Sequence, residues 1–362
     1  MARRVLTGSV VGLFAACLAG YAAQSSAVRR DALRYPPPGR LVDAGGFRLH
    51  LDVRGEPRGA PTVVLEAGLG SFSPNWHWVQ TALADRVRVV AYDRAGLGWS
   101  DPSRAPRDAA TMAKELRGAL NAADIDGPFV LAGHSFGGLV VRAFAELFRA
   151  ETAGLVLVDA SHPDQWARWP VPQSHRIQFV SLGVSIAAAR IGLFRVVDPF
   201  GAVTEGLPER QAAELHAGFV RPSTPVTEAA QMREWERSTR PFLHRAAPLG
   251  ELPLAVIGVG VQPMGAETLT ALQEELPSLS TNSARRVITG ATHESLIADR
   301  AHATQVATAI LAVIDAGGGD RVSAAWSARS QSGSDVGGHG KLPIGGHENC
   351  PWMASRVARW WP

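Results

Sequence analysis

The amino-acid sequence predicts an α/β fold built on a mostly parallel β-sheet with helices on both faces. Short apolar runs, each typical of a strand that is buried on both sides, alternate along the chain with segments of helical spacing. Hydrophobic residues make up 46% of the 362 residues and charged residues only 19%, which is enough apolar material for a large core. The predicted strands are a hairpin over 41–53 and then runs at 62–66, 88–92, 129–132, 155–159, 254–259 and 286–289.

The segments between these strands have helical spacing, except in one long interval. Residues 162–250 contain no convincing core strand but several amphipathic pieces, such as 208–219 and 226–237. We interpret this interval as a helical cap inserted above the sheet, within a domain that spans 41–316. The other predicted helices are 109–123, 136–150, 267–275 and 301–315.

Both ends of the chain differ in composition from the domain. Residues 1–30 contain two arginines followed by a nearly uncharged apolar run, which predicts either a signal peptide or an N-terminal membrane anchor, with a buried helix as the alternative. Residues 31–40 include three consecutive prolines and are predicted to be an extended linker. Residues 317–362 are rich in Gly and Ser and are predicted to be a disordered tail. We therefore expect a membrane-anchored or secreted protein, with its orientation open.

The charge distribution argues against a nucleic-acid partner. The formal net charge is +3, but the first 40 residues carry +5 and residues 317–362 carry +2, which leaves the middle at −4. A nucleic-acid footprint needs cationic density on the folded face that docks. The two cysteines, Cys17 and Cys350, lie outside the predicted domain, and the histidines show no metal-ligand spacing, so we predict no metal site.

The candidate nucleophile is Ser135, in the sequence Gly-His-Ser-Phe-Gly at 133–137. Gly-x-Ser-x-Gly alone is a weak signal, but here an apolar strand ends at the motif and a helix begins directly after it. This is the strand-turn-helix context of a nucleophile elbow, in which the two glycines let the backbones pass closely and the turn exposes the serine hydroxyl. The alternative is an ordinary turn with a helix-capping serine.

A serine nucleophile needs a general base, and His293 is the candidate because it follows the last predicted strand. It is expected at the carboxyl edge of the sheet, where ligands bind in open α/β sheets. The acid that orients the imidazole is less certain, because no aspartate follows the strand 254–259. We favour Asp159, at the end of the strand 155–159, over Glu267 and Asp164.

The oxyanion hole is predicted from two backbone N–H groups, those of Phe136 and Leu69. Phe136 follows the nucleophile, and Leu69 lies in the Gly-Leu-Gly turn after the strand 62–66. Asp93 and Arg94, at the exit of another strand, are interpreted as structural residues.

Three segments in this order resemble the α/β-hydrolase superfamily, specifically its cap-bearing, esterase-like branch: Leu-Glu-Ala-Gly-Leu-Gly at 65–70, Tyr-Asp-Arg-Ala-Gly-Leu-Gly-Trp-Ser-Asp at 92–101 and Ala-Gly-His-Ser-Phe-Gly-Gly at 132–138. The resemblance implies the α/β-hydrolase fold, with a mostly parallel eight-stranded sheet, flanking helices and a helical cap. It also implies that Ser135 and His293 are nucleophile and base, and that Leu69 and Phe136 supply the oxyanion hole. Two departures are Ala67 in place of the usual histidine and the missing aspartate after the penultimate strand.

We therefore predict a serine hydrolase that cleaves carboxylic esters or related acyl bonds of a small-molecule substrate through an acyl-enzyme, without a cofactor. The alternatives are amide or carbon–carbon bond hydrolysis or perhydrolase activity with the same triad. From another class, the chain could be a non-catalytic ligand-binding module of the same fold.

Overall fold

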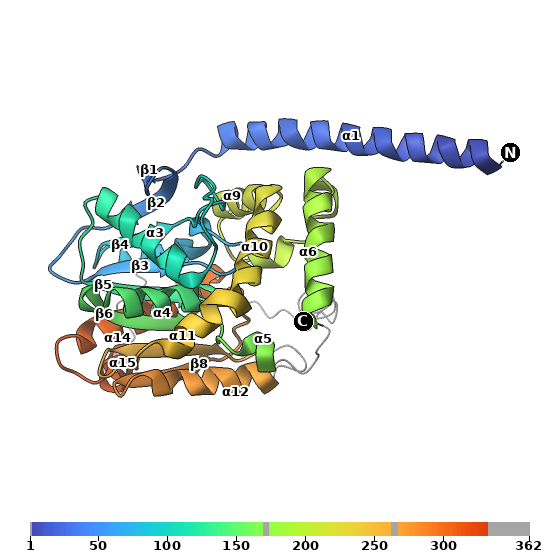
Figure 1. The fold of residues 1–362 in the computed structure, drawn as a ribbon. Helices are drawn as coiled ribbons and strands as arrows, with labels where there is room; N and C mark the ends of the chain where they lie inside the picture. Colours follow the sequence, from blue (N-terminus) through green and yellow to red (C-terminus); the bar gives the residue numbers. More distant parts are fainter. Residues whose placement is uncertain (1, 169–173, 262–266, 332–362) are drawn as a thin grey trace.

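A computed structural model describes residues 2–168, 174–261 and 267–331, and its centre is an eight-stranded sheet (Figure 1). The strand order is β1-β2-β4-β3-β5-β6-β7-β8; β1 pairs antiparallel with β2 and β2 with β4, and all other pairs are parallel. The predicted fold class is therefore confirmed. The strands are β1 (Arg40–Asp43), β2 (Arg48–Arg54), β3 (Thr62–Glu66), β4 (Val89–Tyr92), β5 (Phe129–His134), β6 (Thr152–Val158), β7 (Leu254–Val259) and β8 (Ser283–Ile288).

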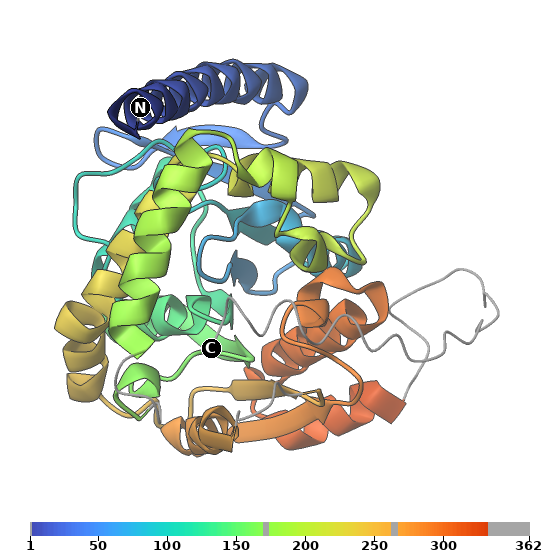
Figure 2. The same cartoon turned by 90° about the vertical axis from the view of Figure 1, so that its right-hand side faces the viewer.

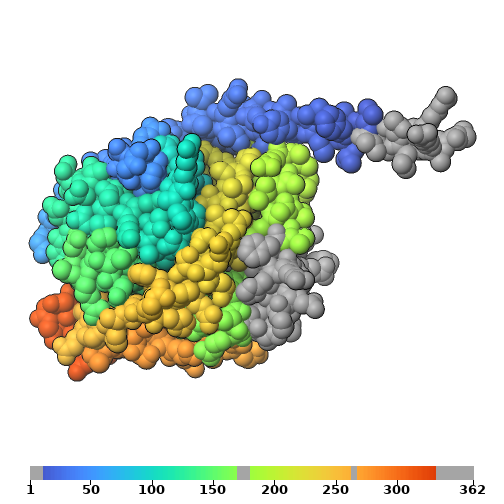
Figure 3. Space-filling view, viewed as in Figure 1, coloured from blue at the N-terminus to red at the C-terminus, as the bar shows by residue number. Residues whose placement is uncertain are grey.

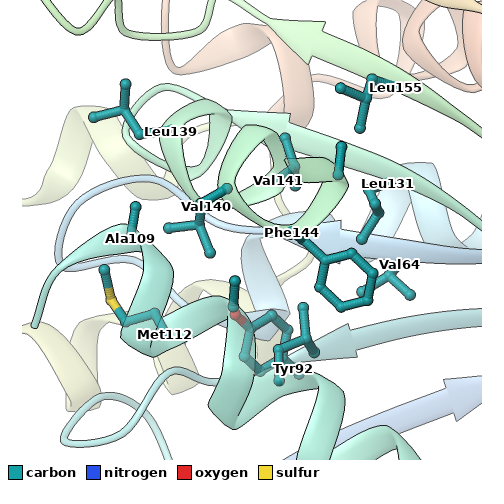
Figure 4. Close-up of a cluster of buried hydrophobic side chains, with 14 of the residues drawn as sticks. Val64, Tyr92, Ala109, Met112, Leu131, Leu139, Val140, Val141, Phe144 and Leu155 are labelled. Atoms are coloured by element: carbon teal, nitrogen blue, oxygen red, sulfur yellow. The ribbon is translucent and has the colours of Figure 1, made fainter. Parts of the chain in front are cut away.

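The central strands are apolar on both sides because helices cover both faces of the sheet. In β3, Val64 belongs to one buried cluster while Val63 and Leu65 belong to the other, as the two-residue period of a strand requires. Figure 4 shows the first cluster, where Phe144 and Val140 lie close to strand residues such as Leu131. Helices α3 (Ala109–Ala122) and α4 (Gly137–Leu147) contribute to this cluster, and α2 (His77–Leu83) and α14 (Arg300–Ala316) to the other.

Between β6 and β7 the described residues form helices and no strand, as the sequence predicted for 162–250. We call this interval the helical insertion. Its α-helices are α5 (Gln165–Arg168), α6 (Ser174–Arg190), α7 (Phe194–Val197), α8 (Gly201–Thr204), α9 (Glu209–Phe219), α10 (Ser223–Glu234) and α11 (Arg240–Arg245). Its helices lie at one end of the sheet, and α11 packs against α4 (Figures 1 and 2).

The N-terminal segment is one long helix, α1 (Ala2–Arg34). Its part Val11–Arg34 is long and apolar enough to cross a membrane by length and composition. The predicted linker of 31–40 begins too early, because the helix continues to Arg34. It ends just before Pro36, since a proline disfavours helical backbone in the residue that precedes it.

The prediction that all of 317–362 is disordered is wrong for its first part. Helix α15 (Val322–Gln331) packs against α14, on the face of the sheet that α14 covers, with Val322 and Trp326 buried. The guanidinium of Arg286 on β8 lies 4.7 Å from the centre of the Trp326 ring. Three buried apolar side chains, this cation–π contact, hydrogen bonds from Arg286 and an ion pair between Arg329 and Asp315 hold the helix, and such tertiary contacts do not show as periodicity in a Gly-rich segment. The rest of the predicted tail, 332–362, lies outside the described residues.

Candidate active site

Ser135 lies on the turn between β5 and α4, with a backbone φ of 53°. This left-handed conformation is uncommon for a residue with a side chain and is held by its neighbours. A Cβ on Gly133 would lie 2.6 Å from the Gly137 carbonyl oxygen, and one on Gly137 would lie 2.5 Å from that of Glu66. Both glycines of the motif are therefore required by close backbone packing. The serine itself is half-buried, so its hydroxyl is placed where a substrate can reach it.

The structure brings His293 to Asp159. The His293 Nδ1 and the Asp159 Oδ2 are 2.5 Å apart, although 134 residues separate them in the chain. Because an ionised carboxylate only accepts, Nδ1–H donates and Nε2 keeps its lone pair. The alternatives for the acid lie elsewhere: Asp164 accepts hydrogen bonds from Arg240 and His244, and Glu267 is exposed at the start of α12 (Glu267–Glu275).

Asp159 can reach the imidazole because of where β6 ends. It directly follows this strand, has a positive φ of 40°, and donates its own N–H to the Ile257 carbonyl of β7 at 2.7 Å. The adjacent backbone is tied to the elbow, since the Ser161 N–H donates to the Ser135 carbonyl at 2.9 Å. The backbone of residues 159–161 therefore connects the carboxylate to the serine turn.

His134 links the nucleophile turn to the histidine loop. Its Nε2 is 2.9 Å from the His293 carbonyl oxygen, and the two imidazole rings have their centres 4.5 Å apart. Burial and the neighbouring His293 keep the pKa of His134 well below the usual histidine value, so its neutral ring donates Nε2–H to that carbonyl. This contact ties the backbone of His293 to the residue that precedes Ser135, although the Ser135 hydroxyl does not itself hydrogen-bond to the His293 ring here. In free enzymes such catalytic contacts are often long and tighten with substrate bound.

The pKa of His293 is raised above the usual histidine value. Burial by itself lowers it, but the hydrogen bond and the negative charge of Asp159 raise it more, with a further contribution from Glu294. The protonated form of the ring is therefore stabilised by the carboxylate beside it.

The predicted oxyanion loop lies directly against the nucleophile. A Cβ on Gly68 would be 3.3 Å from the Ser135 Cβ, so the backbone of this loop lies beside the serine. Among the described residues, neither the Leu69 N–H nor the Phe136 N–H has a hydrogen-bond acceptor. Two unpaired N–H groups near the serine are what an oxyanion hole needs.

Arg94 holds the carbonyl groups of the same loop. Its guanidinium donates to the Ala67 carbonyl at 2.5 Å, to the Gly68 carbonyl and to the Glu66 carboxylate. The guanidinium is also 5.5 Å from the centre of the Phe136 ring. The loop carbonyls are therefore turned towards Arg94, away from the position that an oxyanion would take.

The charge of this arginine is balanced inside the protein. Arg94 and Glu66 are both buried, and the Tyr92 hydroxyl donates to the second oxygen of Glu66. Burial raises the pKa of Glu66, against the opposing effect of Arg94 and the Tyr92 hydrogen bond. A buried charge pair of this kind is costly to separate, so the network keeps the loop in one conformation. The sequence predicts a structural role for Arg94 but not its contact with the oxyanion loop, because that contact forms only in the tertiary structure.

Two other side chains near the site, those of Asp93 and Trp76, have structural positions. Asp93 accepts hydrogen bonds from the Ser73 and Trp99 N–H groups and contacts His50 Nδ1 at 3.0 Å. Trp76 is fully buried in the core. No group of three or more His, Cys, Asp and Glu side chains that could hold a metal ion occurs within residues 2–168, 174–261 and 267–331.

Comparison with known proteins agrees with this architecture. Residues 61–193 match the family model of the alpha/beta hydrolase fold. The chain has the α/β-hydrolase fold. Among solved structures of this fold, a putative lipase from Acinetobacter baumannii superposes with a TM-score of 0.61 at 17% identity, covering 81% of this chain and 96% of that one. An esterase and epoxide hydrolases have the same fold, so the structural neighbours are hydrolases of several kinds.

Similarity in sequence to curated proteins is confined to shorter segments. A probable transporter from Hormonema carpetanum is 36% identical over 137 residues, which are 36% of this chain and 20% of that protein. A putative carbamate hydrolase from Klebsiella pneumoniae is 44% identical over 103 residues, 28% of this chain and 38% of that protein. The chain spans less than half the length of these curated relatives.

Proposed function

We propose that this protein is a serine hydrolase that cleaves carboxylic esters or related acyl compounds through an acyl-enzyme on Ser135. The observation that carries the proposal is the 2.5 Å contact between His293 and Asp159 on a loop that His134 ties to the serine turn. It supplies a base with a fixed tautomer on a loop tied to the turn of a strained, half-buried serine.

The chemistry follows from these positions. Ser135 Oγ bonds to the carbonyl carbon while its proton passes to His293 Nε2, and negative charge develops on the carbonyl oxygen. The N–H groups of Leu69 and Phe136 stabilise that charge. The carbon–oxygen bond to the leaving group then breaks, and His293 returns the proton to the leaving alkoxide. Water attacks the acyl-enzyme with His293 again as the base, which releases the acid and restores Ser135.

Ser135 at the elbow separates this proposal from an alkyl-enzyme mechanism, which requires an aspartate nucleophile at that position. The similarity of fold to epoxide hydrolases is below 25% in identity and does not bear on the reaction. The carbamate named for the Klebsiella relative has the same reacting carbonyl group, so carbamates belong in the substrate panel beside esters and amides.

The experiment is labelling of the folded protein with a fluorophosphonate probe, followed by peptide mapping. We expect one labelled serine, Ser135, and no label in Ser135→Ala. The matched control is Ser161→Ala, whose side chain lies on the neighbouring turn. A folded protein that stays unlabelled would instead be a binding module, and hydrolysis of p-nitrophenyl esters of increasing chain length would define the acyl preference of a labelled one.

We also propose that α1 remains with the mature protein as a membrane anchor. The Gln24 Nε2 donates to the Val220 carbonyl at 2.7 Å, and Arg195 contacts both Gln24 and Asp31 at 2.6 Å. A signal peptide that is removed has no use for specific contacts with the folded domain. The mass of the N-terminal peptide isolated from cell membranes tests this: a mature chain that begins after Ala22 or Ala27 would rule out the anchor.

A further inference from the structure

Glu228 is a carboxyl group on the helical insertion that the proposed mechanism does not use. It lies on α10, and its side chain reaches the oxyanion loop, where a Cβ on Gly70 would be 1.8 Å from the Glu228 Oε1. Gly70 has a φ of 68° and follows Leu69 directly. A glycine at this position therefore leaves the space that the carboxyl group occupies, one residue from the proposed oxyanion donor.

The surroundings of this carboxyl are unusual for a structural residue. Among the described residues no hydrogen bond or ion pair is formed by Glu228, and the residue is half-buried. Burial raises the pKa of Glu228 to about 7, against the lowering effect of Arg94. Enclosed carboxyl groups that serve packing are normally hydrogen-bonded, because an unpaired one is costly.

Arg94 does not act as the missing partner. Its terminal nitrogens are occupied by Glu66 and by the carbonyls of Ala67 and Gly68, while its buried Nε has no partner. The carboxyl of Glu228 therefore keeps its full capacity to accept hydrogen bonds at the side of the loop where a substrate would lie.

We propose that Glu228 is a specificity residue that binds a hydrogen-bond-donating group, hydroxyl or ammonium, carried by the substrate close to its scissile carbonyl. This inference rests on the proposed function of the site. A substrate with such a donor satisfies the carboxyl, whereas a purely apolar acyl chain leaves it desolvated and unpaired. A hydrogen bond to a charged group corresponds to a preference of about tenfold or more.

The test compares p-nitrophenyl butyrate with the 2-hydroxy, 3-hydroxy and 3-amino derivatives of the same ester. For the unaltered protein we expect kcat/KM to be at least about tenfold higher for one or more of the three derivatives. In Glu228→Leu the preference should fall to within threefold. In Glu228→Gln a preference for hydroxyl should partly remain, because the amide oxygen still accepts, while one for ammonium should be lost.

The matched control is Glu205→Leu, an exposed carboxylate of the same insertion, which should keep the preference. Fluorophosphonate should still label Ser135 in Glu205→Leu at the rate of the unaltered protein, and its presence or absence on Ser135 in every variant separates a failure of this inference from a failure of the nucleophile. No preference in the unaltered protein, or an unchanged preference in Glu228→Leu, would overturn the assignment.

A second, independent observation concerns the outer surface of the insertion. Val180 and Val184 on α6, Ile191 and Leu193 in the following turn, and Val196 and Val197 on α7 are exposed, with Val196 83% and Val180 67% accessible. We call these six residues the apolar ridge. Apart from α1, the described residues have only three other exposed large hydrophobic side chains, and these are on separate elements: Val226, Val261 and Val287. An exposed apolar group of this size marks an interaction surface.

The position of α1 indicates which partner covers the ridge. The N-terminal half of α1 projects from the body of the protein on the same side as α6, and α6 runs across the direction of α1 (Figures 1 and 3). Viewed along α1, the helices α6 and α7 lie on the face from which its N-terminus extends (Figure 2). Close packing fixes this arrangement, because a Cβ on Gly20 would lie 2.7 Å from the Ile191 carbonyl oxygen.

We infer that the apolar ridge rests on the lipid bilayer into which α1 inserts. Insertion of the part of α1 that precedes its contact with the domain at Gly20 leaves α6 near the membrane plane, where valines enter the acyl boundary and the exposed Arg190 at the end of α6 meets the headgroups. The helical insertion then lies against the membrane surface, so that the proposed substrate subsite takes its ligands from beside the bilayer.

Spin labels on the full chain in phosphatidylcholine–phosphatidylglycerol vesicles test this contact. In a Cys17→Ser, Cys350→Ser background, a label at Val196→Cys should become more accessible to oxygen and less accessible to a water-soluble nickel chelate than in detergent. The control is a label at Val287→Cys, which is 46% exposed on β8, the last strand in the sheet order. It should not change.

Equal nickel accessibility at the two positions in vesicles would overturn the docking. Flotation of the same samples shows whether α1 inserts, and hydrolysis of a soluble ester shows whether the active site is intact. A failure of the ridge contact is therefore distinguishable from a failure of the anchor or of the proposed activity.

Discussion

The carboxyl edge of the sheet and the helical insertion differ in what their characteristic side chains contact. At the sheet edge, Asp159 binds His293, His134 binds the histidine loop, and Arg94 binds the oxyanion loop. On the insertion, Glu228 has no hydrogen bond among the described residues, and the apolar ridge is uncovered. The difference indicates that the sheet edge holds a fixed reaction geometry, while the insertion is shaped for contacts with molecules outside the chain.

The largest expected loss of activity follows replacement of the nucleophile or the base. Ser135→Ala or His293→Ala should lower kcat for a p-nitrophenyl ester by up to about a millionfold, because the triad acts as a unit. Measuring turnover before and after further purification shows whether the residual rate belongs to the variant or to a contaminating enzyme. Near-normal turnover in His293→Ala would mean that another residue is the base and that the sheet edge does not hold the reaction geometry.

Asp159→Asn should have the next largest effect, about 10⁴-fold in kcat, since the amide no longer fixes the tautomer or stabilises the imidazolium. Steady-state kinetics measures it, and thermal unfolding shows whether the variant is folded. Asp164→Asn is the matched control, because Asp164 pairs with Arg240 and His244 instead of His293. If Asp164→Asn loses more activity than Asp159→Asn, the assignment of the acid is wrong.

Arg94→Lys tests whether the oxyanion loop is positioned by its carbonyls. Lysine keeps the charge but cannot reproduce the planar fork of donors, so the loop should lose its fixed conformation. We expect kcat to fall by about 10²-fold, comparable to the loss of one oxyanion donor, with a smaller change in KM. Arg107→Lys, which alters a buried arginine paired with Glu115 away from this loop, is the control. An equal loss in both variants would indicate a general loss of stability.

The smallest effect is a shift in pH dependence. Catalysis needs neutral His293, and its raised pKa means that protonation begins at a higher pH than for an ordinary histidine. The rate should therefore fall as the pH decreases, with the acid limb of kcat/KM above the usual value of 6.5. In Asp159→Asn the negative charge that contributes most to raising the pKa of His293 is removed, so the limb should move to lower pH. A limb that stays in place would mean that another group titrates.

Local patterns in the sequence determined the elements of the sheet. Strands β3 and β7 have the predicted bounds, because runs that are apolar on both faces have few other uses in a soluble domain. Ser135 was predicted because the strand, the motif and the helix follow one another directly in the sequence, so the local sequence by itself defines the turn. Helix α15 was not predicted, since it depends on Trp326 meeting Arg286, which is distant in the chain. Helix α2 is only seven residues long, and no periodicity shows over such a length.

The partners in the site were decided by tertiary structure. From the sequence, Asp159, Asp164 and Glu267 were all candidates for the acid, and only the meeting of two loops 134 residues apart places Asp159 on His293. The same holds for Arg94 on the oxyanion loop and for Glu228 against Gly70. The sequence by itself thus determined which residue types lie at the ends of strands. Which of them touch depends on loop conformation and on the packing of the insertion, and neither leaves a periodic trace in the sequence.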